Sequence, residues 1–165
     1  MGLFELEVER DTNPVDLLEQ VASLNDWQFE RINDEISMTV NGVWSDYDVS
    51  LSWMEEFEAL HLACAFDLKI TENRMNEAIN LISQVNEQLL IGHFDLWRED
   101  GAVMFRQTLL LNGGADPTAE QLECLLTSAL EACERYYQAF QYVVWAGKSS
   151  KEALDAVLFE THGTA

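Results

Sequence analysis

The strongest constraint on the fold is an alternation of apolar and polar residues between positions 47 and 53. Every second residue there is large and apolar, and the residues between them are Asp48, Ser50 and Ser52. Because successive side chains of a strand point to opposite faces, the pattern predicts a half-buried strand with one wet face. Residues 60–66 follow the same rule, with His61 on the second face.

Two shorter strands are predicted before this one. Residues 27–31 and 36–40 each alternate, Asn33-Asp34 marks the turn between them, and Asn41-Gly42 is a strong turn signal. Four consecutive strands with short connections predict an antiparallel meander.

A hairpin and four helices complete the predicted elements. Hairpin strands are expected at residues 93–98 and 102–111. Each helix has a capping or terminating residue at one end or both, such as Asn13-Pro14 at the first start and Gly147 at the end of the longest. The expected helices cover residues 13–25, 71–91, 118–147 and 149–159.

This order of elements predicts the α+β class. We expect an antiparallel sheet, made of the four-strand meander plus the C-terminal hairpin, covered by helices. Residues 1–12 are expected to form an acidic N-terminal segment, and residues 13–165 a single domain.

The net charge of the chain limits the classes of partner that it can bind. It has 30 acidic and 9 basic residues, a net charge of -21, beside 48% hydrophobic residues. Nucleic-acid binding needs clustered Lys and Arg, and anionic membranes repel an acidic surface. We therefore expect neither nucleic acid nor a membrane as partner. The acidity serves either as a solvated surface or in the choice of a protein partner.

The cysteines and the start of the chain indicate a reducing compartment. Cys64, Cys124 and Cys133 are odd in number, and none belongs to a CxxC pair. Cys124 and Cys133 cannot bridge within one straight helix, because about 13 Å of rise separates them. The start lacks the features of a secretory signal, and no apolar run approaches the roughly 20 residues that span a bilayer. We expect a cytoplasmic protein without disulfide, metal or other cofactor.

The sequence contains no GxSxG, P-loop, GxGxxG or HExxH motif, and we expect no enzymatic activity. His93, Glu160 and His162 form a candidate polar site, because imidazole and carboxylate together suit acid–base work. The alternative interpretation is that they cap a helix end and a strand end. His61 and Cys64 fall on opposite faces of a predicted strand, so their spacing does not indicate a metal site.

An exposed patch of aromatic and aliphatic residues is a candidate protein-interaction surface. Trp97 has the parity of the outer side of the hairpin, and Met104 and Leu110 share it where the turn keeps register. Tyr137 and Trp145, at the aromatic end of the long helix, are further candidates. Alternatively, a second helix covers that face. A homodimer is expected to use these apolar residues, away from the more acidic N-terminal third.

Three segments carry a family resemblance. They are NEQLLIGHFDLW at residues 86–97, YYQAFQYVVWAGKS at 136–149 and ETHG at 160–163. Together they resemble the YbjN-domain family of bacterial proteins, named as sensory-transduction regulators, over about residues 13–165. The family resembles the small acidic chaperones of type III secretion, which are commonly homodimers that hold unfolded segments of a partner.

The resemblance implies a non-enzymatic, protein-binding module with a chaperone-like or regulatory role. It provides no active-site residues to carry over. The alternative function is a small-molecule-binding or catalytic domain that uses a site around His93, Glu160 and His162.

Overall fold

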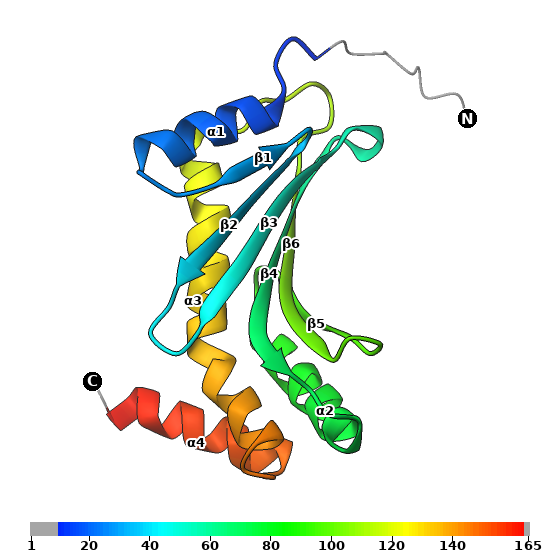
Figure 1. Cartoon of the computed structure of the whole chain (residues 1–165), viewed down its shortest axis with the longest axis vertical. Coiled ribbons are helices and arrows are strands. Elements are labelled where there is room, and N and C mark those ends of the chain that lie inside the picture. The colour runs from blue at the N-terminus through cyan, green and yellow to red at the C-terminus, as the bar shows by residue number, and fades with distance from the viewer. Residues whose placement is uncertain (1–9, 164–165) are drawn as a thin grey trace.

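The computed structural model describes the backbone of residues 10–163 and the side chains of residues 10–159. Within these residues lie a six-stranded antiparallel sheet and four α-helices (Figure 1). In chain order the elements are α1 (Pro14–Leu24), β1 (Glu30–Ile32), β2 (Glu35–Asn41), β3 (Asp46–Met54), β4 (Ala59–Lys69), α2 (Met75–Asn86), β5 (His93–Trp97), β6 (Ala102–Leu110), α3 (Ala119–Val144) and α4 (Ser150–Gly163).

The sheet has the strand order β1-β2-β3-β4-β6-β5, and all neighbouring strands are antiparallel. This confirms the predicted α+β class, the four-strand meander and the C-terminal hairpin. The hairpin joins the sheet through its second strand, so β6 lies beside β4 and β5 forms an edge. Its turn keeps register, since Trp97 pairs with Ala102 and His93 with Arg106.

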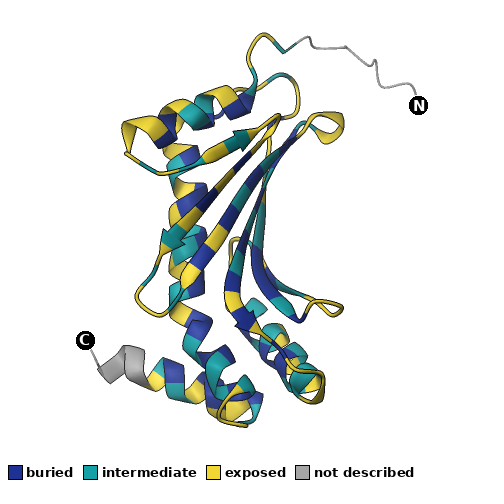
Figure 2. Cartoon of the chain, in the orientation of Figure 1, coloured by how far each residue is buried: buried dark blue, intermediate teal, exposed yellow. Residues whose placement is uncertain are grey.

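Helices α1 and α3 lie on one face of the sheet, and α3 runs along much of its length (Figure 1). The large apolar residues of β2, β3 and β4 point toward this face and are buried, while the residues between them are more exposed (Figure 2). The Phe66 ring centroid is 5.3 Å from those of Tyr137 and Phe140 and 5.8 Å from that of Phe94. Each such ring contributes about 1.5–3 kcal/mol by burial, so the contact between α3 and the sheet dominates the core.

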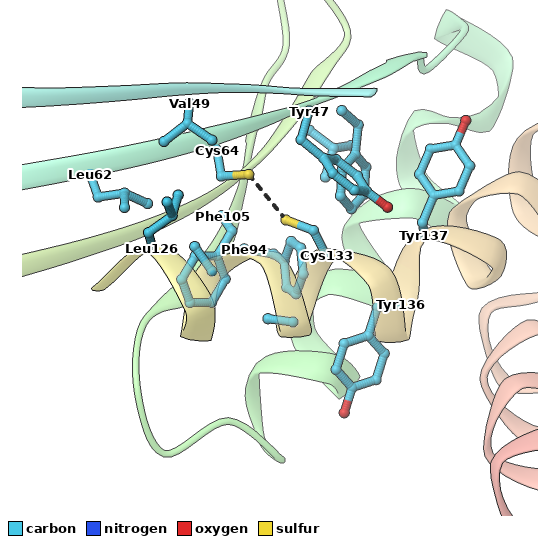
Figure 3. Close-up of a cluster of buried hydrophobic side chains, with 14 of the residues drawn as sticks. Tyr47, Val49, Leu62, Cys64, Phe94, Phe105, Leu126, Cys133, Tyr136 and Tyr137 are labelled. Carbon is cyan, nitrogen blue, oxygen red and sulfur yellow. Dashed lines mark hydrogen bonds between the residues drawn. The ribbon is translucent and has the colours of Figure 1, made fainter. Parts of the chain in front are cut away.

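Two buried thiols also join the sheet to α3. Cys64 of β4 and Cys133 of α3 are fully buried, and their Sγ atoms are 3.6 Å apart (Figure 3). Burial raises the pKa of the Cys133 thiol far above its usual range, so this thiol stays protonated at neutral pH. Cys124 is exposed instead. The expected absence of a disulfide in the native protein stays a prediction.

Side-chain caps define several helix ends. Asn13 caps α1, and Thr118 with Gln121 forms the predicted capping box of α3. The C-terminal end of α3 has a cap that the sequence did not indicate: Arg74 Nε donates to the carbonyl oxygen of Val143 at 2.8 Å. A cation at this end also interacts favourably with the helix dipole.

The first predicted strand is shorter than expected. A strand was expected over residues 27–31, but β1 covers only Glu30–Ile32. The reason is the way α1 ends: Asp26 adopts a left-handed conformation, with φ of 57°, and Trp27 donates its backbone N–H to the carbonyl of Ala22 at 2.9 Å. The chain must leave this turn before it can pair with β2.

The second helix is also shorter than expected. A helix over residues 71–91 was expected, but α2 covers Met75–Asn86 after one turn of 3-10 helix. Asn86 ends it, because its side chain bonds the edge of β5. Its Oδ1 accepts from Phe94 N at 2.8 Å, and its Nδ2 donates to Phe94 O at 3.1 Å. A side-chain amide thus satisfies backbone groups that a further strand would bond.

Glu58 links three segments at the turn from β3 to β4. Its carboxylate accepts hydrogen bonds from the backbone N–H groups of Gly114 at 3.2 Å and Gly113 at 3.3 Å, and from the guanidinium of Arg10 at 3.1 Å. The bond from Gly114 is the largest cause that holds the pKa of Glu58 below its ordinary value.

This depressed pKa predicts a pH-dependent contribution to stability. The contribution is present above the unfolded-state pKa of about 4.3 and is lost as the pH falls through the lower folded-state value. Glu58→Gln removes this titration, so the melting temperature of the wild type should fall more steeply than that of the variant below about pH 5. Thermal unfolding followed by circular dichroism measures both slopes. The exposed neighbour change Glu56→Gln should keep the wild-type slope, and parallel wild-type and Glu58→Gln curves would contradict the prediction.

Candidate functional site

The face of the sheet opposite to α1 and α3 is the candidate site. It carries small and polar side chains, many of them half-buried. Ser52, His61 and Thr108 form one row across β3, β4 and β6, and Ala63 and Arg106 lie side by side in the next. Among residues 10–163 no helix covers this face (Figure 1). The alternative expectation of a covering helix is therefore wrong, and the face can accept a partner.

Arg106 organises a polar cluster on this face. Its Nη1 donates to Asp95 Oδ2 of β5 at 3.1 Å, and its Nε donates to His61 Nε2 of β4 at 3.1 Å. The two contacts come from strands on either side of β6, so they hold the guanidinium between them. Nη2 makes no hydrogen bond to any of the described residues, so one donor group is available to a ligand.

His61 is neutral in this cluster. Burial is the main cause that lowers its pKa, and the positive charge of Arg106 and the neighbouring His93 add to the effect. Because Nε2 accepts from Arg106, the proton of the neutral ring resides on Nδ1. The Nδ1–H group points away from Arg106, so the free donor beside the ring is Nη2 of the guanidinium.

A pocket of about 490 Å³ opens at this cluster. The loop between α2 and β5 forms one side of it, and β4 and β6 form its floor. The lining residues are His61, Leu90, Ile91, Gly92, His93, Arg106, Gln107 and Thr108. None of the described residues that line the pocket is a carboxylate, and the volume lies within the range of ligand sites in proteins.

The candidate polar site was expected at His93, Glu160 and His162. The structure places His93 at the start of β5, exposed and at the rim of this pocket. The side chains of Glu160 and His162 lie outside the described residues. The candidate polar site at these three residues therefore stays a prediction.

The residues expected to form an interaction surface divide into two groups. Trp97, Leu110 and Trp145 expose 53%, 67% and 66% of their surface. Met104 shares the outer parity but is 5% exposed, and Tyr137 is 3% exposed and packs edge-on against Phe66 in the core. Met104 and Tyr137 were therefore wrong as surface candidates; for Tyr137 the reason is that the aromatic end of α3 turns toward the sheet.

Sequence reasoning missed the polar cluster. His61 was considered only as a metal ligand beside Cys64, and Arg106 and Asp95 were not singled out. The signal that was available is the parity of Arg106, which places a cation on the outer face in a chain with only 9 basic residues. Its contacts depend on β6 lying between β4 and β5, which local patterns do not specify.

Comparison with protein families gives a clear result. Residues 14–142 match the model of the YbjN family, described as "Putative bacterial sensory transduction regulator". The chain belongs to the YbjN family. Comparison with curated proteins gave no significant match.

Solved structures with the same fold include a YbjN protein and chains of two protein complexes. The crystal structure of YbjN from E. coli, described as a putative transcription regulator, is 12% identical, with a TM-score of 0.56, over 73% of this chain and 85% of that chain. A chain of the HopA1–SchA chaperone–effector complex is 13% identical, with a TM-score of 0.52, over 73% and 89%.

A chain of the ExsC–ExsE complex is 20% identical, with a TM-score of 0.52, over 73% and 90%. These similarities confirm the expected type III secretion chaperone-like fold.

The described residues lack two further features. No helix there combines the length and apolar character needed to cross a membrane. Within the same residues, no group of three or more His, Cys, Asp or Glu side chains is placed to hold a metal ion.

Gly92 holds the wall of the pocket close to β6. Its φ is +69°, and a Cβ atom there would overlap the buried ring of Phe105 and crowd the carbonyl of Arg106. Gly113 has a comparable φ of +81° with open space around it. Substitutions at the two glycines therefore allow the cost of backbone strain to be measured separately from the cost of steric overlap.

We expect Gly113→Ala to destabilise the fold by about 1 kcal/mol, the cost of a left-handed alanine. Gly92→Ala should cost about 1–3 kcal/mol more, because the ring of Phe105 must move within a packed core. Urea unfolding of both variants measures the difference. Equal losses would show that the loop shifts away from β6 without resistance.

Proposed function

We propose that this chain is a non-enzymatic, protein-binding module with a chaperone-like or regulatory role in the bacterial cytoplasm. The observation that carries the proposal is the uncovered outer face of a six-stranded sheet, in a fold shared with a chain of a chaperone–effector complex. A face without a covering helix offers small side chains and backbone to a partner. Cytoplasmic location is consistent with three free cysteines.

The surface chemistry supports a protein as the partner. Carboxylates such as Glu35, Asp46 and Asp48 stand on the outer face of β2 and β3, where they repel phosphate. Apolar side chains stay exposed at Trp97 and Leu110. This combination favours a polypeptide that places apolar or cationic side chains on the sheet and disfavours nucleic acid.

Photo-crosslinking tests which face binds. With p-benzoylphenylalanine in place of Ser50, on the outer face of β3, the purified protein should form covalent adducts with its native partner in extracts of the source bacterium. The same residue in place of the exposed Glu131 of α3 should form few or none. Equal adducts at both positions, or adducts at Glu131 alone, would contradict binding by the sheet face.

Self-association is the second part of the proposal. A net charge of -21 opposes dimer formation. At physiological ionic strength the screening length is about 8 Å, so like charges that lie closer than this across an interface still repel one another. A homodimer interface must therefore be largely apolar. Trp97, Leu110 and Trp145 are among the exposed apolar residues that suit it.

We expect light scattering at micromolar concentration to give twice the chain mass of 18.8 kDa. Trp97→Ala should shift the protein toward the monomer with little change in melting temperature. Trp27 is partly buried and packs against the core, so Trp27→Ala should instead destabilise the fold by roughly 2 kcal/mol and leave the dimer intact. A mass near 18.8 kDa at both low and high salt would exclude the dimer. The reverse ranking of the two variants would move the interface elsewhere.

The second candidate function is a small-molecule-binding or catalytic domain around His93, Glu160 and His162. The pocket at His93 is the observation that favours it. Convergence of the three side chains within hydrogen-bond reach is the feature that distinguishes this function from the first.

A further inference from the structure

The β6 strand has an open edge next to the pocket. Leu111 donates its N–H to Glu58 O, which places the backbone groups of the odd-numbered residues of β6 toward β4. The even-numbered residues therefore face the opposite edge. Arg106 bonds β5 there through its pairing with His93, but β5 begins at His93. Within the described residues, the edge groups of Thr108 and Leu110 have no hydrogen-bond partner.

The start of β5 blocks one end of this open edge. A strand that pairs with Leu110 and then with Thr108 next meets the start of β5, at Gly92 and His93. Gly92 cannot move aside freely, because it lies against the ring of Phe105 and the backbone of Arg106. A chain that enters along this edge must stop at that point or turn away from the sheet.

The closed end is also the cationic point of the pocket. Arg106 stands there with His61 and His93, and among the described side chains no carboxylate lines the pocket. Asp95 lies beyond Arg106 and already engages Nη1. In a chain with 30 acidic residues, a carboxylate group from outside finds donors here without an opposing acid in the lining.

Apolar side chains flank the same position. Leu90 and Ile91 line the pocket and are 97% and 51% exposed, and Leu110 is 67% exposed at the open end. A partner segment with apolar side chains can therefore bury them on either side of the edge.

We propose that the β6 edge binds the C-terminal end of an extended protein partner. Its last residues pair antiparallel with Thr108 and Leu110, and its terminal carboxylate accepts hydrogen bonds from the guanidinium of Arg106. An internal acidic residue fits less well, because the chain would have to continue through the start of β5. This inference rests on the proposed protein-binding function and names the part of the partner that is recognised.

The test uses the full chain and two libraries of fluorescent eight-residue peptides. Both have identical randomised sequences with apolar residues at the last and third-last positions; one has a free C-terminal carboxylate and the other a C-terminal amide. We expect the free-carboxylate peptides to bind at least about tenfold more tightly, since the amide loses the charge-assisted hydrogen bonds.

Two variants localise the binding. Arg106→Gln should reduce the affinity for the free-carboxylate peptides about tenfold and leave the amide peptides unchanged. Lys69→Gln is the matched control, because it removes the same charge from the outer face at the far end of β4, and it should have no effect. Thr108→Pro removes an N–H that the fold does not use, so it should abolish binding while the circular dichroism spectrum stays unchanged.

The outcomes distinguish this inference from the proposed function. Equal binding of both libraries would overturn C-terminal recognition, while the sheet face would still be tested by the Ser50 crosslinks. Unchanged affinity in Arg106→Gln, or loss in Lys69→Gln, would overturn the assignment of the carboxylate. Competition by free acetate as effective as that by the peptides would show a small-anion site and overturn the peptide edge.

Discussion

The fold depends on the contact between α3 and a single face of the sheet. Phe66 stands near the centre of that contact, with Phe94 beside it and Tyr137 and Phe140 above it from α3. Tyr47 closes one side of the cluster, 6.0 Å from Phe66. Because the helices that pack on the sheet do so on this face, the apolar residues of each strand need only every second position. The opposite face is thereby free to carry side chains chosen for something other than packing.

The edges of the sheet differ in how their backbone groups are protected from pairing. The difference leaves the open stretch of β6 as the place where a partner strand can pair. At one edge β1 is three residues long, and its Arg31 bonds Asp16 and Glu19 of α1. At the other edge Asn86 satisfies the backbone of Phe94 in β5. Short strands and side-chain partners are recognised ways to protect an edge from unwanted pairing. The stretch of β6 beyond the start of β5 has no such protection among the described residues.

Local pattern was enough to predict most of the fold but little of the site. Alternation identified β3 and β4 with their faces, and it placed His61 and Cys64 on opposite sides because that depends on parity alone. The hairpin was predicted, but the insertion of β6 between β4 and β5 was not, and that insertion creates the contacts of Arg106. The Cys64–Cys133 contact joins residues 69 positions apart, which no local pattern relates. Tyr137 looked like a surface residue because an aromatic helix end has no direction until the sheet is placed against it.

The sparse cations of the chain explain why one arginine can matter so much. Arg10 bonds the carbonyl of Leu111, Arg31 bonds α1, and Arg74 caps α3, so three of the 9 basic residues are engaged in holding the fold. The surface remains strongly acidic, since the chain has 30 acidic and 9 basic residues. Against that background the partially exposed guanidinium of Arg106 is one of few cations on the open face, with Lys69 at the far end of β4. A partner that carries positive charge can bind at many points of the acidic surface, whereas at the pocket a carboxylate finds its cationic donor in Arg106. The acidic surface repels an anionic partner at long range, and Arg106 attracts its carboxylate at short range. A C-terminal carboxylate adds a single negative charge to the partner, so the long-range repulsion that it meets is small.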